Sequence, residues 1–432
     1  MAMTCYEKND YITSFDNKNM FRLKSSAEIK KGYFIVHAYD LINERECFLK
    51  FTGMDPERDE DRINLTRESK FKFFYPYIEQ VYGLFTGLDP KGCPILGVSV
   101  EWIEGQDLSF ARGILQNRIK VVKEKPDDLT EDEAERIIFR QIMQFLYGMN
   151  YYLRFTAPSY LHRDIRPRNI MIMNSDKGDG DVKIIDFDYA HISKSTDTQN
   201  LVGHNVAFSR GYTSPNVGEK ANHNELPDEQ DEIYSAGRVI YFWLHGKDYY
   251  KSSEYEGKTP AYFVDKKIGY GFDINRFNEK YRHAKYNKFI HILNRMCAEP
   301  GSKEQYHSIG EVIRDMKQFL IEYCGNSNKA YEELIQVNKM PLLQENTQYN
   351  KKARMVTYEV MDSFEGKIGK PLLEYTMRDI LNMMTIYNIK GEIYYIPMKG
   401  TECFNRNKNS EFKIYDQDIF IQGETKIKFT IK

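Results

Sequence analysis

The stretch that decides the fold runs from Tyr160 to His191. It reads YLHRDIRPRNIMIM, then a polar loop, and then VKIIDFDYAH. Asp164 and Asn169 lie in one loop, whereas Asp186 directly follows the short apolar run Val-Lys-Ile-Ile. Asp carboxylates and an Asn carbonyl are hard oxygen ligands of the kind that magnesium prefers. The sequence therefore predicts that these segments form a site for a divalent metal ion.

These two segments resemble the eukaryotic-like Ser/Thr protein kinases, in which H-R-D-x-x-x-x-N marks the catalytic loop and D-F-G the metal site. The resemblance implies that Asp164 takes the proton of the acceptor hydroxyl and that Arg166 stabilises the moving phosphate. It also implies that Asn169 and Asp186 bind Mg²⁺, and that ATP supplies the phosphate. A charged turn and a strand-end cap are the alternative, but two matched segments in the right order argue against it.

Two upstream residues fit the same family. Lys50 ends an apolar strand pattern, and Glu68 follows 18 residues later (68 − 50 = 18) in an expected helix. The resemblance implies that Lys50 holds the α- and β-phosphates and that Glu68 pins the Lys50 amine in place. A solvated helix face is the alternative for Glu68, because several acidic residues precede it: Glu57, Asp59, Glu60 and Asp61.

The run from Val98 to Leu108, VSVEWIEGQDL, resembles the hinge of the family. In that resemblance Glu101 and Ile103 present backbone groups to the adenine edge, and Asp107 bonds the ribose. A plain strand followed by a turn is the rival interpretation.

The glycine-rich loop and the D-F-G segment both depart from the family pattern. Only Gly32 remains of the glycine-rich loop in the run from Glu28 to Val36, so the backbone cannot approach phosphates as it does in G-x-G-x-x-G. Asp188 replaces the glycine of D-F-G, as in small-molecule kinases that act on choline or aminoglycosides. Two alternatives to a protein kinase therefore stay open, a nucleotide-binding pseudokinase scaffold and a small-molecule kinase. Transfer of AMP is a third, without a specific sequence sign.

Further residues bear on which kind of kinase this is. Ser209 stands six residues before Pro215, where Ser/Thr-directed members carry a hydroxyl that bonds the catalytic Asp. Asn216 and Tyr306 stand where the family has a buried Glu–Arg pair. Losing both halves together strands no buried charge and is therefore tolerable. Glu232 replaces the usual Asp of a buried helix.

The composition is that of a folded protein. Of 432 residues, 41% are hydrophobic and 29% are charged, which argues against extensive disorder. The net charge of −2 argues against nucleic acid as a partner held through the overall field. The absence of a long apolar run or signal-like start predicts no membrane partner and a cytoplasmic location. A protein substrate is the expected partner, and a bacterial or viral protein acting in a host cell is a compatible origin.

These observations predict an α+β architecture, a two-lobed protein-kinase-like fold with an extra C-terminal α+β domain. The expected domains are an N-terminal lobe at 1–104, a C-terminal lobe at 105–325 and an accessory domain at 326–432, where a partner or regulator would bind. Strands are expected at 33–38, 46–51, 79–85, 94–101, 392–396, 411–421 and 425–431. Helices are expected at 59–74, 130–154, 231–244, 287–297, 308–323 and 372–387.

Overall fold

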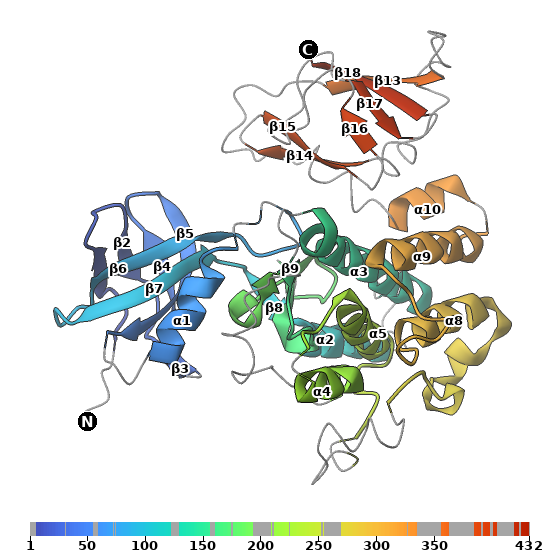
Figure 1. Ribbon diagram of the computed structural model, residues 1–432, viewed down its shortest axis with the longest axis horizontal. Helices are drawn as coiled ribbons and strands as arrows, with labels where there is room; N and C mark the ends of the chain where they lie inside the picture. Colours follow the sequence, from blue (N-terminus) through green and yellow to red (C-terminus); the bar gives the residue numbers. More distant parts are fainter. Residues whose placement is uncertain are drawn as a thin grey trace. The chain divides into compact units, whose positions relative to one another are not determined.

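The computed structural model forms two compact units, Met1–Asn326 and Ser327–Lys432. In Figure 1 the first unit has a strand-rich lobe, in blue and cyan, beside a helix-rich lobe, in green to orange. None of the helices described is both long and apolar enough to cross a membrane. The described residues are 6–30, 32–54, 59–71, 73, 75–121, 129–155, 160–173, 176–192, 209, 211–223, 225–251, 254, 269–325, 327–334 and six strands between 356 and 431.

The small lobe is built on one antiparallel sheet with the strand order β2-β1-β6-β7-β5-β4-β3. Because β2 also pairs with β4, the sheet closes on itself around an apolar core that includes Phe21, Leu49 and Phe51. The sequence pattern did not predict β1, β2 or β3, because strands of three or four residues are too short to show a clear alternation. The strands are β1 (Tyr11–Ser14), β2 (Met20–Leu23), β3 (Glu28–Lys30), β4 (Tyr33–Asp40), β5 (Arg45–Gly53), β6 (Val81–Leu88) and β7 (Pro94–Glu101).

The helix described in this lobe, α1 (Asp59–Glu68), is shorter than expected. The prediction of a helix through residue 74 is wrong, because the chain turns at Ser69, whose hydroxyl donates to the carbonyl of Thr66 at 2.8 Å. The apolar residues that follow leave the helix to pack on the large lobe. The ring centroid of Phe73 lies 4.9 Å from that of Phe187.

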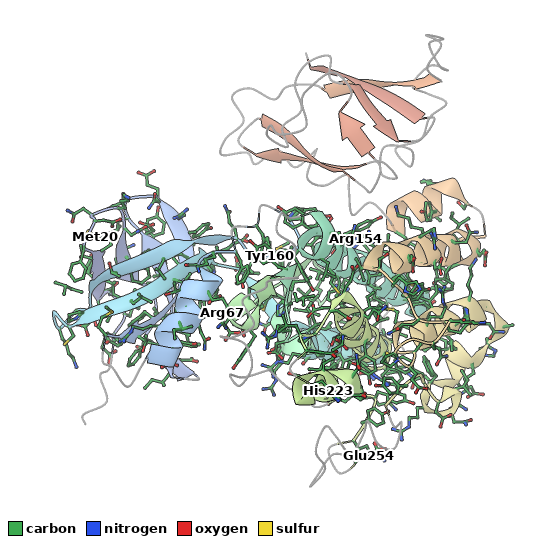
Figure 2. The ribbon with its side chains drawn as sticks, viewed as in Figure 1. Met20, Arg67, Arg154, Tyr160, His223 and Glu254 are labelled. Atoms are coloured by element: carbon green, nitrogen blue, oxygen red, sulfur yellow. The ribbon has the colours of Figure 1, made fainter. Side chains whose placement is uncertain are left out.

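The large lobe is mainly helical, as expected. Thr130 and Glu133 form the capping box of α3, and the Ser308 hydroxyl caps α9, so both predicted helix starts are confirmed. A π-helical turn, Tyr151–Phe155, continues α3. The helices are α2 (Leu108–Val121), α3 (Glu131–Asn150), α4 (Pro215–Asn222), α5 (Glu229–His245), α8 (Asn287–Met296) and α9 (Ile309–Tyr323). Figure 2 shows the dense side-chain packing among them.

His245, at the end of α5, makes stability depend on pH. It is 5% exposed, and burial lowers its pKa to about 3. Between pH 6.5 and 3, His245 is therefore protonated in the unfolded chain but not in the folded chain. The free energy of unfolding consequently falls as the pH falls. When the pH is lowered from 7 to 5, this residue should reduce the free energy of unfolding by about 2 kcal/mol.

Urea unfolding of the wild type and of His245→Phe at both pH values tests this prediction. The phenyl ring suits the surrounding Tyr241, Phe277 and Tyr281 rings and does not titrate. The variant should lose about 2 kcal/mol less than the wild type on acidification. Equal losses in the two proteins would show that His245 is protonated in the folded state.

The second unit contains the helix α10 (Asn328–Leu334), a four-stranded sheet of order β13-β18-β17-β16 and the hairpin β14–β15. The strands expected at 392–396 and 425–431 are confirmed. The helix expected at 372–387 is wrong for residues 384–387, where Thr385, Ile386 and Tyr387 favour the strand that pairs with β15. Residues 372–383 and 411–418 lie outside the described part. The strands are β13 (Val356–Asp362), β14 (Met384–Ile389), β15 (Glu392–Pro397), β16 (Thr401–Cys403), β17 (Ile419–Gln422) and β18 (Thr425–Ile431).

Candidate active site

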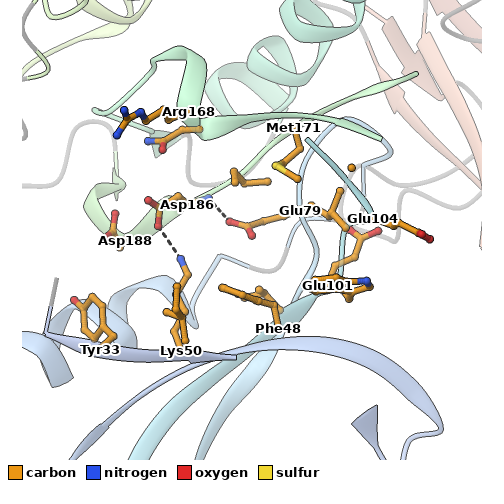
Figure 3. A pocket seen from close by; sticks show the side chains of 17 residues that line it. Tyr33, Phe48, Lys50, Glu79, Glu101, Glu104, Arg168, Met171, Asp186 and Asp188 are labelled. Carbon is orange, nitrogen blue, oxygen red and sulfur yellow. Dashed lines mark hydrogen bonds and ion pairs between the residues drawn. The ribbon is translucent and has the colours of Figure 1, made fainter. Parts of the chain in front are cut away.

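A cavity of about 360 Å³ lies between the two lobes of the first unit. Figure 3 shows its side chains converging from the sheet on one side and from the loops of the large lobe on the other. It is lined by Tyr33, Ile35, Phe48, Lys50, Glu79 and Val100, by Glu101, Trp102, Ile103, Glu104 and Gly105 between the lobes, and by Arg168, Asn169, Met171, Ile185, Asp186 and Asp188.

Strand register explains why the sheet presents these residues together. In an antiparallel pair, directly opposed residues point to the same face, as do residues two apart on one strand. Ile35 is opposed to Lys50, and Phe48 to Val100. Lys50 therefore projects into the cavity from a face that is otherwise apolar.

Lys50 is the centre of charge in this cavity. Its amine lies 2.7 Å from Oε1 of Glu68 and 2.7 Å from Oδ1 of Asp186, the ion pair dashed in Figure 3. Burial alone would lower the pKa of the Lys50 amine, but the carboxylates of Asp186 and Glu68 outweigh it and hold that pKa well above its usual range. The amine thus stays cationic and links the small lobe to the large lobe.

Glu68 is the last residue of α1 and is fully buried. Burial raises its pKa to about 7, although the Lys50 amine opposes this shift. Helix α1 therefore brings a carboxylate to Lys50, which is the pairing that the 18-residue spacing suggested.

Asp164 and Asn169 form one hydrogen-bonded unit in the loop after β9 (Tyr160–Leu161). The Asn169 amide nitrogen donates to Oδ2 of Asp164 at 2.9 Å and to its backbone carbonyl at 2.8 Å. The guanidinium of Arg166 lies 3.2 Å from the same Oδ2. The Ser209 hydroxyl donates to Oδ1, so the bond expected between Ser209 and Asp164 is present.

Glu232 on α5 supports this loop through hydrogen bonds. Its Oε1 accepts the backbone N–H of Arg163 at 2.6 Å, and its Oε2 accepts the hydroxyl of Tyr152 at 3.0 Å. Burial raises the pKa of Glu232, opposed by the nearby His162. The longer Glu side chain therefore supports the loop backbone where the family usually has Asp.

Asn216 and Tyr306, which replace the buried Glu–Arg pair of the family, each form a hydrogen bond with a nearby carboxylate. The Asn216 amide donates to Asp231 at 3.3 Å, and the Tyr306 hydroxyl donates to Asp315 at 2.8 Å. Lys220 pairs with Asp231 at 2.7 Å. As expected, losing both halves of the pair strands no charge at either position.

The donor set at Asn169 and Asp186 suits magnesium. With the Asn169 nitrogen turned to Asp164, its oxygen is available, and Asp186 adds a carboxylate on the cavity wall. Two such oxygens are enough, because Mg²⁺ keeps several waters and phosphate oxygens as ligands. Among the described residues, no group of three or more His, Cys, Asp or Glu is placed to hold a metal ion.

Of the other residues expected to bind the nucleotide, some line the cavity and Asp107 does not. Glu101 and Ile103 line the cavity, and the Glu101 carboxylate pairs with Lys183 at 2.5 Å. Asp107 ends β8 (Gly105–Asp107), is not among the lining residues, and accepts the backbone N–H of Phe110 at 3.2 Å. Gly32 forms the turn between β3 and β4 with a φ of 88°, which favours glycine there.

Several lining residues were not predicted from the sequence, among them Tyr33, Phe48, Glu79 and Arg168. Phe48 could have been predicted, because it lies two residues before Lys50 and therefore points to the same face of the strand. Glu79 carried a weaker signal, a lone carboxylate between the apolar Ile78 and Val81. Nothing in the sequence alone places Tyr33 in the cavity.

Comparison with known proteins agrees with this geometry. Serine/threonine-protein kinase tousled-like 2 of Xenopus tropicalis is 24% identical over 255 residues, 54% of this chain and 33% of the relative. Serine/threonine-protein kinase 16 of Homo sapiens is 28% identical over 166 residues, 37% of this chain and 50% of the relative. Integrin-linked protein kinase 1 of Arabidopsis thaliana is 26% identical over 277 residues, 61% and 51% of the two chains.

The chain thus spans between a third and about half of the length of these relatives. The model of the protein kinase domain matches residues 102–361, more than half of the chain, beginning after Lys50 and Glu68. The chain belongs to the protein kinase family.

Proposed function

We propose that this protein kinase transfers the γ-phosphate of ATP, with magnesium, to Ser or Thr hydroxyls of a protein substrate. The observation that carries the proposal is the meeting of the Lys50 amine and the Asp186 carboxylate, 2.7 Å apart, beside Asn169 in one cavity. These groups come from positions 136 residues apart in the chain. An assembly of one cation with oxygen ligands is what phosphoryl transfer requires.

In this proposal Lys50 binds the α- and β-phosphates, and Glu68 holds the amine in place. Asn169 and Asp186 hold the magnesium ion, which when bound neutralises charge on the phosphates. The backbone groups of Glu101 and Ile103 lie where they bind the adenine edge. The Asp107 carboxylate, which also accepts the backbone N–H of Phe110, bonds the ribose in this proposal.

Asp164 is the proposed general base. The acceptor oxygen forms its bond to the γ-phosphorus as the bond to the β-phosphate oxygen breaks, and Asp164 takes the hydroxyl proton. Arg166, beside Oδ2 of Asp164, stabilises charge on the transferred phosphoryl group. The bond from Ser209 to Asp164 supports Ser or Thr as acceptor, because that hydroxyl typifies Ser/Thr-directed members of the family.

Labelled ATP and a purified protein acceptor test this function. We expect label on phosphoserine or phosphothreonine with magnesium, and none after chelation until magnesium is restored. Phosphotyrosine alone would contradict the Ser/Thr assignment.

The same reaction separates the remaining alternatives. Label on choline or an aminoglycoside, but on no protein, would favour a small-molecule kinase, which Asp188 suggests. Nucleotide binding without transfer to any acceptor would favour a pseudokinase scaffold, which the single Gly32 suggests. Mass spectrometry of the product distinguishes added phosphate from added AMP.

A further inference from the structure

Glu79 is a buried carboxylate on the cavity wall that the roles proposed above leave without a task. It is 3% exposed. Burying a carboxylate is costly unless it is paired or hydrogen-bonded. The nearby cations are already engaged, Lys50 by Glu68 and Asp186, and Lys183 by Glu101. Among the described residues Glu79 forms no ion pair of its own.

The hydrogen bond that Glu79 does make is to the backbone of Asp186. Its Oε1 accepts the Asp186 N–H, and Figure 3 marks this bond with a dashed line. Within the described part of the chain, this is the one hydrogen bond of the Glu79 carboxylate. The buried carboxylate therefore acts on the backbone of a proposed metal ligand.

The backbone of Asp186 is unusual. Its φ of 69° and ψ of 65° place it in the left-handed region, which residues other than glycine rarely adopt. Strand β11 (Val182–Ile184) has ended two residues earlier, so no neighbouring strand supplies an acceptor for this N–H. The Glu79 side chain supplies one.

Two backbone hydrogen bonds bring Glu79 to this place. The Ile184 N–H donates to the carbonyl of Tyr77 at 2.8 Å, and the Glu79 N–H donates to the carbonyl of Ile184 at 2.9 Å. They form a parallel bridge between Ile78 and Ile184. The Glu79 side chain adds a third bond, two residues beyond Ile184. The segment that leads into Asp186 is thus fixed at both its strand end and its turn.

We propose that Glu79 is a positioning residue, which holds Asp186 in the left-handed conformation that directs its carboxylate to Lys50. The effect on the reaction rate rests on the proposed function, whereas the effect on the Asp186 backbone does not. Glu79 acts through Asp186 and does not contact the reacting atoms.

Glu79→Gln and Glu79→Met form a matched pair for the test, since both side chains have nearly the same length and neither is charged. Gln keeps an oxygen that accepts the Asp186 N–H, whereas Met has none. We expect Glu79→Gln to keep kcat within about threefold of the wild type, and Glu79→Met to lose about tenfold or more. Any change in the KM for ATP should be smaller than the change in kcat of Glu79→Met, because the hinge residues are unchanged.

Hydrogen exchange of the peptide containing Asp186 gives a readout independent of activity. Its amide should exchange about tenfold faster in Glu79→Met than in the wild type, and at the wild-type rate in Glu79→Gln. If Glu79→Met does not fold, Glu79→Ala removes the acceptor in the same way.

Two results would overturn the proposal. Wild-type exchange and kcat in Glu79→Met would show that Asp186 needs no acceptor, and equal damage in both variants would show that the charge of Glu79 matters instead. Exchange that follows the expected pattern in a chain without transfer activity would refute the proposed function and leave the positioning intact.

Discussion

Replacing Asp186 by Asn is expected to lower kcat about a thousandfold or more. The substitution keeps the size of the side chain but removes the anionic member of the proposed metal pair and the 2.7 Å partner of Lys50. A bound metal stabilises the charge of the transition state by several kcal/mol. This energy corresponds to the expected loss in kcat, because about 1.4 kcal/mol equals a factor of ten in rate. Initial rates with labelled ATP at saturating magnesium measure the loss.

Asp188→Asn is the matched control for this experiment. Asp188 lines the same cavity two residues further on, but it has no role in the proposed reaction. We expect its kcat to stay within about tenfold of the wild type. Equal loss in both variants, or near-normal activity of Asp186→Asn, would mean that the metal is held elsewhere.

Replacing Asp164 by Asn should lower kcat by about a hundredfold to ten-thousandfold, because that is the usual contribution of a general base. Nucleotide affinity should change little, since Asp164 is not among the residues that line the cavity. Single-turnover rates and calorimetric titration with ATP measure the two quantities separately.

Ser209→Ala is the control, because it removes the hydroxyl that donates to Asp164 but leaves the carboxylate. It should lose far less activity than Asp164→Asn. An Asp164→Asn variant that loses nucleotide binding as well would show that the loop, and not the base, has been damaged.

The parts of the site that the sequence predicted are those carried by short contiguous patterns. Asp164 and Asn169 lie in one loop and Asp186 directly follows a strand, so their local pattern is enough to identify them. Lys50 and Glu68 needed the family spacing as well. The ion pair between them joins a strand to a helix 18 residues further along the chain, and no local pattern encodes that contact.

The features that the sequence did not predict depend on contacts between residues far apart in the chain. Helix α1 ends at Glu68 because Phe71 and Phe73 pack against residues far away in the chain, which overrides their compatibility with a helix. Glu79 is visible in the sequence, but its bond to Asp186 depends on a bridge between segments more than a hundred residues apart. Asp107 fits the family pattern and also caps a helix, and its bond to the ribose stays a prediction.

The pairing of β2 with β4 affects how the small lobe meets other proteins. An open sheet leaves unpaired N–H and C=O groups at both borders, which recruit strands from other chains. Here the two borders are joined, and among the strands described in this lobe only the three-residue β3 remains outside the ring. Among the described strands of this lobe, addition of a strand is thereby limited to the free edge of β3, and recognition of the rest of the sheet relies on side chains.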